Sequence, residues 1–304
     1  MGIKTSGILE RMKKLSQERT GEVIILSESI IWGLFPILAI LSYSGLSPLT
    51  SLAWTTAISF FFFLFVVIAR RSWNNVFQRG IFWQLLAITG ITGVLFYVLF
   101  YIGLEHTSAG NAAIIGTAEI LFSFLFFNVW KKEYISFKYI IGIVCMLLGV
   151  LIILAPNFSG FRIGDIVILL AVFIAPLGNY FQKSLRSKIS SEQILFFRTL
   201  IAAPILFFIA YLAGESIIIP PISVWWILLV NGVVLFGITK LLWIESIFRI
   251  GVTKSISLSS VSPIFTLIFA YLIFHDEPTF VQIIAVPLSV VGVYLLTRPA
   301  THMS

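Results

Sequence analysis

Charged residues and cysteine are both scarce in this chain of 304 residues. Only 11% of the residues are charged, whereas ordinary soluble domains are about one quarter charged. The hydrophobic fraction of 59% and the mean hydropathy of +1.05 exclude a soluble globular domain. The single cysteine, Cys145, excludes an intrachain disulfide and any metal site built from several cysteines. The composition therefore predicts a polytopic membrane protein.

Motifs for nucleotide hydrolysis and for metal-dependent catalysis are also missing. The chain contains no GxxxxGK[ST] loop, so we do not expect it to be driven directly by ATP. Its three histidines, His106, His275 and His302, fall in predicted connections or in the tail and form no HExxH pair. We therefore expect no enzyme, no catalytic residue, no metal site and no cofactor. A membrane channel and an intramembrane enzyme are the alternatives from other functional classes.

Long apolar runs predict ten transmembrane helices, because about 20 apolar residues are needed to cross a hydrocarbon core of about 30 Å. The fold class that follows is all-α, with every span a helix. The expected spans are residues 22–44, 47–69, 81–104, 107–130, 136–155, 163–184, 192–213, 223–247, 251–274 and 279–297.

The distribution of lysine and arginine predicts the orientation in the membrane. Most of these residues fall in residues 1–21, which we expect to be a basic cytosolic arm, and in alternate connections between the spans. The positive-inside rule then places both termini in the cytosol of a multi-pass protein of the cytoplasmic (inner) membrane. The net charge of +7 predicts no nucleic-acid partner, because the excess lies where anionic lipid headgroups are expected.

An internal repeat divides the chain into residues 22–156 and residues 163–298. At an offset of 144 positions, Glu133 aligns with Glu277, and one gap brings the following glycine and proline residues into register. Each half has five predicted helices, and this odd number means that the second half enters the membrane from the opposite side. The sequence therefore predicts two inverted five-helix repeats, an architecture that many secondary transporters use.

Three short stretches add a family resemblance to this arrangement. They are IWG (residues 31–33), SPIFTLIFAYLIFHDEPT (262–279) and VVGVYLL (290–296). With the five plus five helices, they resemble the EamA family of the drug/metabolite transporter superfamily over about residues 20–298. The resemblance implies a carrier of the cytoplasmic membrane that usually exports amino acids or other small metabolites. It also implies a central cavity lined by helices 1, 3, 4, 6, 8 and 9, with helices 5 and 10 at the periphery, and it fixes no single substrate.

Glu119 lies near the centre of the fourth predicted span. A charge at that depth costs roughly 2.5 to 3.5 kcal/mol on insertion scales, so it needs a compensating interaction. At the repeat offset Glu119 lies opposite Pro263, and the resembled family usually has proline at both positions. Two interpretations remain: a protonated carboxyl that hydrogen-bonds a neighbouring helix, or a carboxylate that binds a cationic substrate group or a competing proton.

Lys240, in the eighth predicted span, is the natural basic partner for Glu119. Its long stem also allows the ammonium to reach the membrane interface, which is the structural alternative. Tyr97 and Tyr101 of the third span and Trp243 of the eighth suggest an aromatic wall. Together these residues would suit a zwitterion, with Glu119 binding the ammonium, Lys240 the carboxylate, and the rings an apolar side chain.

Smaller polar residues complete the candidate site. Asn111 shares a stripe of small residues with Glu119, and Ser259 lies on a similar stripe of the ninth span. Such stripes either allow close helix packing or leave room for a watery cavity. Asn179 either lines the cytosolic vestibule or forms an interhelical hydrogen bond. Glu28 and Arg198 lie about six residues inside predicted boundaries, which favours snorkelling or an ion pair beside a gate.

The sequence as a whole predicts a secondary transporter for a small-molecule substrate in the lipid bilayer. The leading hypothesis is an exporter of amino acids or related amine-bearing compounds that works by alternating access, driven by the substrate gradient or by coupled protons. The alternative is a carrier for drugs or for other small metabolites, such as a nucleotide-sugar-like anion. An anion carrier would be expected to show more basic residues at cavity depth. The sequence does not decide whether the protein forms a homodimer.

Overall fold

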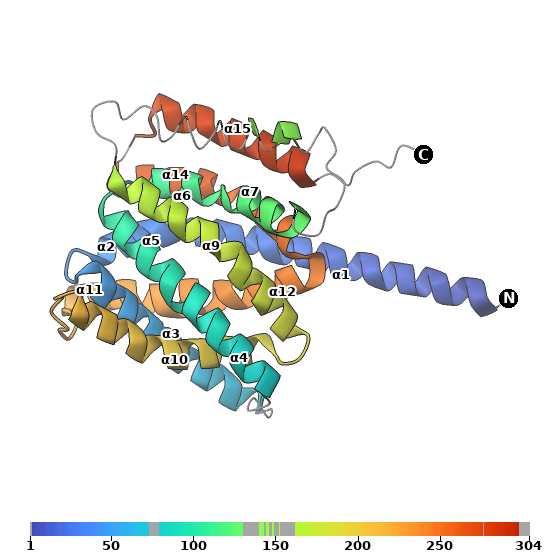
Figure 1. Ribbon diagram of the computed structural model, residues 1–304, viewed down its shortest axis with the longest axis horizontal. Coiled ribbons are helices and arrows are strands. Elements are labelled where there is room, and N and C mark those ends of the chain that lie inside the picture. The colour runs from blue at the N-terminus through green and yellow to red at the C-terminus, as the bar shows by residue number, and fades with distance from the viewer. Residues whose placement is uncertain are drawn as a thin grey trace.

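The computed structural model is a helical bundle (Figure 1). It describes residues 2–72, 79–129, 162–275 and 277–297, together with a few isolated positions between 140 and 152. This part of the chain contains no strand. In chain order its elements are α1 (Gly2–Trp32), α2 (Phe35–Ser42), α3 (Pro48–Ala69), α4 (Arg79–Ile88), the π-helix η1 (Thr89–Leu95), α5 (Phe96–Glu105), α6 (Ala109–Gly116), α7 (Glu119–Phe124), the π-helix η2 (Leu125–Val129), α9 (Ile163–Arg186), α10 (Ser191–Leu212), α11 (Ile222–Leu229), the π-helix η3 (Val230–Ile238), α12 (Thr239–Ile250), α13 (Val252–Ser259), α14 (Ser262–Phe274) and α15 (Phe280–Thr297).

Eight helical spans in the described ranges are long and apolar enough to cross a membrane. They correspond to the first four and to the sixth through ninth spans expected from hydropathy. Their bounds are Ser16–Ser42, Pro48–Ala69, Gly80–Glu105, Ala109–Phe127, Ile163–Arg186, Ser191–Leu212, Ile222–Ile250 and Val252–Phe274.

The expected total of ten spans is not confirmed. The expected fifth span, residues 136–155, lies almost entirely outside the described residues. The expected tenth span coincides with α15, whose apolar stretch, Phe280–Gly292, is shorter than the others. Helix α15 contacts α6 and α13 and lies at one edge of the bundle (Figure 1). The structure therefore confirms an all-helical multi-pass protein with eight spans in the part described.

The first helix is longer than its hydropathy suggests. α1 begins at Gly2, inside the segment expected to be a separate arm, and it projects from the bundle before entering it (Figure 1). The apolar span itself begins at Ser16 rather than at residue 22. Residues of the first span therefore lie about six positions deeper in the span than the expected start at residue 22 implies.

Three spans are interrupted near their middle. The first breaks between α1 and α2, the fourth between α6 and α7, and the ninth between α13 and α14. Pro36 and Pro263 stand in the first turns of α2 and α14, where a missing backbone N–H is tolerated but the preceding helix cannot continue through it. The fourth span breaks without a proline, immediately before Glu119.

Two of the irregularities recur in both halves of the chain, whereas the break of the first span has no counterpart in the continuous helix α9. The breaks of the fourth and ninth spans lie within one residue of the 144-position offset, and the π-helices η1 and η3 overlap at the same offset. π-helices are rare and often lie at functional sites. The two-repeat organisation thus extends from the sequence to the local backbone geometry.

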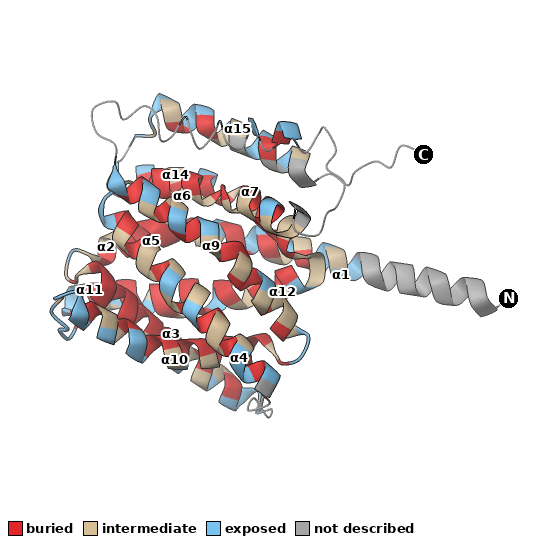
Figure 2. Ribbon diagram, viewed as in Figure 1, coloured by how far each residue is buried: buried red, intermediate tan, exposed pale blue. Residues whose placement is uncertain are grey.

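Buried residues gather on the inward faces of the spans, while the outer faces carry exposed apolar side chains (Figure 2). The outward side chains of Phe65 and Ile222, for example, are 69% and 92% exposed. That pattern is required of helices surrounded by hydrocarbon, whose backbone polar groups are satisfied within each helix. Inside, the rings of Tyr97 and Phe236 pack with centroids 4.4 Å apart, and Phe35 and Phe100 lie 5.1 Å apart.

Candidate functional site

A central cavity of about 130 Å³ lies among the interrupted spans. Four charged side chains line it, each from a different span: Glu28, Glu119, Arg198 and Lys240. Its aromatic walls are formed by Trp32, Phe35, Phe96, Tyr97, Phe100 and Trp243. The cavity is lined by the six spans that the family resemblance implied, and also by α10, the seventh span in chain order, through Arg198.

Glu119 is held by a hydrogen-bond network based on α9. The side-chain amide of Asn179 donates to Glu119 Oε1 at 2.5 Å. Asn179 Oδ1 in turn accepts from Trp243 Nε1 at 3.1 Å and from Gln182 Nε2 at 3.3 Å. Gln182 also donates to the hydroxyl of Thr92 at 3.3 Å. The network joins four spans and fixes the Glu119 carboxyl at the cavity wall, immediately after the break in its helix.

Lys240 is buried, and its ammonium contacts an aromatic ring rather than a carboxylate. Its Nζ lies 3.2 Å from the centroid of the Trp32 ring and 6.0 Å from that of Trp243. Among the described residues, no carboxylate oxygen lies within 4.0 Å of Nζ, so Lys240 and Glu119 do not form a direct ion pair. A cation on the face of tryptophan is stabilised by the ring quadrupole, and more strongly where water is excluded.

Glu28 and Arg198 complete the charged set, and both are almost fully buried, at 1% and 3% exposure. Glu28 lies in the last turns of α1, just before the break, and its Oε2 accepts no hydrogen bond from the described residues. The guanidinium of Arg198 makes no hydrogen bond or ion pair with the described part of the chain. Buried polar groups normally have partners, so these two side chains are suited to bind a solute in the cavity.

Six of the eight residues proposed from the sequence line the cavity: Glu119, Lys240, Tyr97, Trp243, Asn179 and Ser259. Tyr101 does not, because its ring is fully buried in the core against Phe35, at a centroid distance of 6.0 Å. Asn111 does not line it either. Its Oδ1 accepts a hydrogen bond from Gln282 Nε2 at 2.9 Å, which links α6 to α15.

Glu28 and Arg198 lie in the cavity wall, which corrects the interpretation of both as snorkelling or gate-side residues. For Glu28 the reason is the earlier start of the first span, which places this residue twelve positions inside it. For Arg198 the reason is its packing against η1, where a Cβ added to Gly93 would lie 3.1 Å from Arg198 Cγ, which leaves the side chain 3% exposed and in the cavity wall. A signal was available in the sequence, because uncompensated charges of both signs inside spans point to an intramembrane site.

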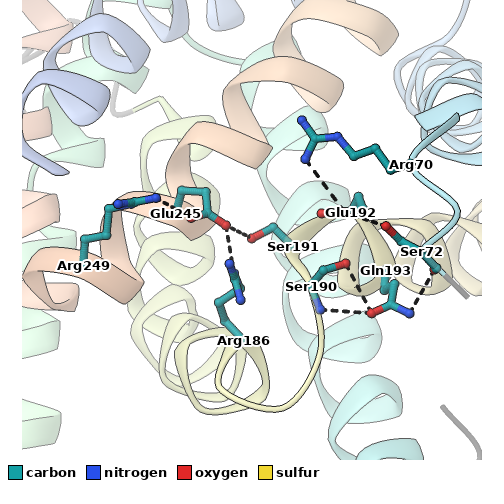
Figure 3. Close-up of polar contacts among 9 residues, drawn as sticks. All are labelled: Arg70, Ser72, Arg186, Ser190, Ser191, Glu192, Gln193, Glu245 and Arg249. Atoms are coloured by element: carbon teal, nitrogen blue, oxygen red, sulfur yellow. Dashed lines mark hydrogen bonds and ion pairs between the residues drawn. The ribbon is translucent and has the colours of Figure 1, made fainter. Parts of the chain in front are cut away.

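Polar contacts tie one end of the bundle together, where α9, α10 and α12 meet (Figure 3). The carboxylate of Glu245 accepts hydrogen bonds from Ser191 at 2.6 Å and from Arg186 at 2.8 Å. Arg249 pairs with the other oxygen of Glu245 at 3.4 Å. Nearby, Lys254 pairs with Glu22 at 2.6 Å and also with Glu18, which joins α13 to α1.

The comparison with protein families decides what kind of protein this is. The EamA-like transporter family matches residues 19–155 and again residues 162–298. The chain belongs to this family. Among the described residues of this EamA-like transporter, no group of three or more His, Cys, Asp or Glu side chains is placed to hold a metal ion.

Two curated relatives agree with this assignment, and a solved structure shares the fold. An "uncharacterized transporter" of Methanothermobacter thermautotrophicus is 25% identical over 91% of this chain and 85% of its own length. The "uncharacterized transporter YyaM" of Bacillus subtilis is 24% identical over 89% of this chain and 91% of its own. A crystal structure with 18% identity superposes with a TM-score of 0.70 over 92% of this chain and 97% of the other, which supports the fold.

Proposed function

We propose that this EamA-like transporter is a secondary carrier that exports amino acids or related amine-bearing compounds from the cytosol by alternating access. One observation carries the proposal: two acidic and two basic side chains share a buried aromatic cavity without direct ion pairs between them. Removing charges from water is costly unless each charge gains a partner. A zwitterionic solute supplies partners of both signs at once.

Each part of an amino acid has a matching group in the cavity. The carboxylates of Glu28 and Glu119 suit an ammonium group, and the guanidinium of Arg198 suits a carboxylate, which arginine binds with two parallel hydrogen bonds. The aromatic walls accept an apolar side chain. A simple anion is a poorer match, because the two basic side chains of the cavity are balanced by two carboxylates.

The size of the cavity favours a small solute. Its volume of about 130 Å³ is several times the roughly 10 to 15 Å³ of such space that one water molecule needs. A small amino acid or amine fits in that space with little rearrangement.

The interrupted helices give alternating access a physical basis. Three spans that line the cavity break at its depth, so each can bend there with little change elsewhere. We take the two repeats to be inverted, with both termini in the cytosol, so that rocking of one half against the other exposes the cavity to either side in turn. The ion-paired end around Glu245 would then close the cytosolic side. The driving force would be the substrate gradient or coupled protons.

The experiment that tests this proposal is counterflow of labelled amino acids and simple amines into proteoliposomes. Wild type, Glu119→Gln and the exposed control Glu105→Gln are compared over a pH range of about 5.5 to 8.5. The glutamine keeps an acceptor oxygen for Asn179 and removes the charge. Saturable counterflow that Glu119→Gln loses and Glu105→Gln keeps supports the proposal. A wild type without saturable counterflow, or with a large electrical conductance instead, refutes it.

A further inference from the structure

The ammonium group of Lys240 lies where a bound amine would be expected. It contacts the face of Trp32 at 3.2 Å inside the cavity, and the carboxyl groups of Glu28 and Glu119 line the same cavity. A primary ammonium on an aromatic face near two carboxylates is also the arrangement that an amine-bearing solute would adopt. Lys240 and such a solute therefore compete for the same position.

The surroundings of Lys240 allow it to leave that position. No carboxylate of the described residues lies within 4.0 Å of its Nζ, so no direct ion pair has to be broken. Its side chain is a flexible four-carbon stem with a compact charge. The ring of Trp243, with its centroid 6.0 Å from Nζ, offers a second aromatic face to a displaced ammonium.

We propose that Lys240 is an internal substitute for the substrate's ammonium group. It occupies the face of Trp32 when no substrate is bound and is displaced when an amine-bearing substrate binds. This inference rests on the proposed function. It also differs from the expectation that Lys240 binds the substrate's carboxylate, and it leaves that role to Arg198.

The substitution has a consequence for the transport cycle. A carrier that performs net transport must return across the membrane without substrate, and its buried carboxylates then need compensation. Lys240 supplies the compensating charge during the return step. The wild type should therefore carry out net efflux as well as exchange. A protein without this lysine should reorient only when a substrate amine takes the place of the ammonium, and should become an exchanger.

The test measures two fluxes in the same proteoliposomes with labelled L-alanine, L-threonine and L-leucine as probes. One is net efflux into substrate-free buffer, and the other is exchange against unlabelled solute. In Lys240→Gln, net efflux should fall by about tenfold or more, whereas exchange should stay within about threefold of wild type. The exposed control Lys188→Gln should retain both fluxes.

Every result of this test bears on the inference. Equal retention or equal loss of the two fluxes in a folded Lys240→Gln overturns it, because the lysine would then have no role or would bind substrate directly. If that variant does not fold, the two fluxes of the wild type are the test. Net efflux at a rate comparable with exchange supports the inference, and exchange without net efflux overturns it. A wild type that moves none of the probes removes the proposed function, and with it the site on which this inference rests.

Discussion

The hydroxyl of Thr266 donates a hydrogen bond to the backbone oxygen of Gly33 at 2.8 Å. The bond connects the break in the first span to the first turns of α14, after the break in the ninth span. At the same contact, a Cβ added to Gly33 would lie 2.8 Å from Cβ of Phe265, so the two helices touch with no room for a side chain. The two interruptions are therefore physically joined at the wall of the cavity.

Replacing Thr266 by valine tests this connection. The change removes the donor and leaves the oxygen of Gly33 without that buried bond, which should cost about 1 kcal/mol of unfolding free energy. We expect a lower unfolding temperature in detergent and slower transport. The matched control is Thr20→Val at an exposed position. An unfolding temperature equal to that of wild type would show that the bond contributes nothing.

The contact between α5 and α9 depends on glycine at position 103. A Cβ there would lie 2.5 Å from Cγ1 of Ile168 and 2.9 Å from the backbone oxygen of Gly164, and a backbone atom cannot move without shifting its helix. Gly103→Ala should therefore lower stability by about 1 to 3 kcal/mol, measured by thermal unfolding. Gly80→Ala, where nothing lies within 4 Å, should leave stability unchanged or slightly raised. Equal stability of both variants would contradict the close packing.

The hydrogen bond from Trp243 to Asn179 should affect substrate affinity through the network that holds Glu119. Trp243→Phe keeps an aromatic ring but loses the donor to Asn179 Oδ1. Because a net hydrogen bond is worth about 0.5 to 1.5 kcal/mol, KM for an amino acid should rise by roughly twofold to tenfold. The control is Trp226→Phe, which alters an exposed ring on the outer face. An unchanged KM in Trp243→Phe would mean that this network does not position the carboxyl.

Arg198 should select for substrates that carry a carboxylate. In Arg198→Gln, transport of amino acids should fall by about tenfold or more, because a charge-assisted bidentate contact is lost. Transport of simple amines, which lack the carboxylate, should change much less. The two classes are compared in the same vesicles, with Arg70→Gln as a control outside the cavity. Equal losses for both classes would refute the assignment.

Much of the fold follows from sequence because hydropathy is a local property. The limits of seven of the eight spans could be predicted to within about three residues, since each apolar run must match the thickness of the bilayer, whereas the first span begins at Ser16 instead of residue 22. Glu119 and Lys240 could be recognised in the same way, because a charge inside an apolar run is costly without a function. The depth of Glu28 was harder to predict, because its helix and its apolar span both begin before the position that hydropathy indicates.

Other features depend on packing that no single segment encodes. Tyr97 and Tyr101 lie four residues apart and were expected to share a face, yet Tyr97 lines the cavity and Tyr101 is buried in the core. Both residues lie in α5, so they share a helix face but differ in depth, and one turn beyond Tyr97 the ring of Tyr101 packs against Phe35 and Tyr43. The partner of Asn111, Gln282, is 171 positions away and could not be inferred from helical spacing.

The formal charges of Glu28, Glu119, Arg198 and Lys240 cancel, and this has an electrical consequence. Moving one elementary charge through a membrane potential of 100 mV is worth about 2.3 kcal/mol. Moving a binding site without net charge changes no electrical energy. The membrane voltage therefore neither drives nor opposes the return of the empty site across the bilayer. A zwitterion leaves that balance unchanged, whereas an organic cation or an accompanying proton disturbs it. The response of flux to an imposed voltage therefore reports the charge that the cargo itself brings.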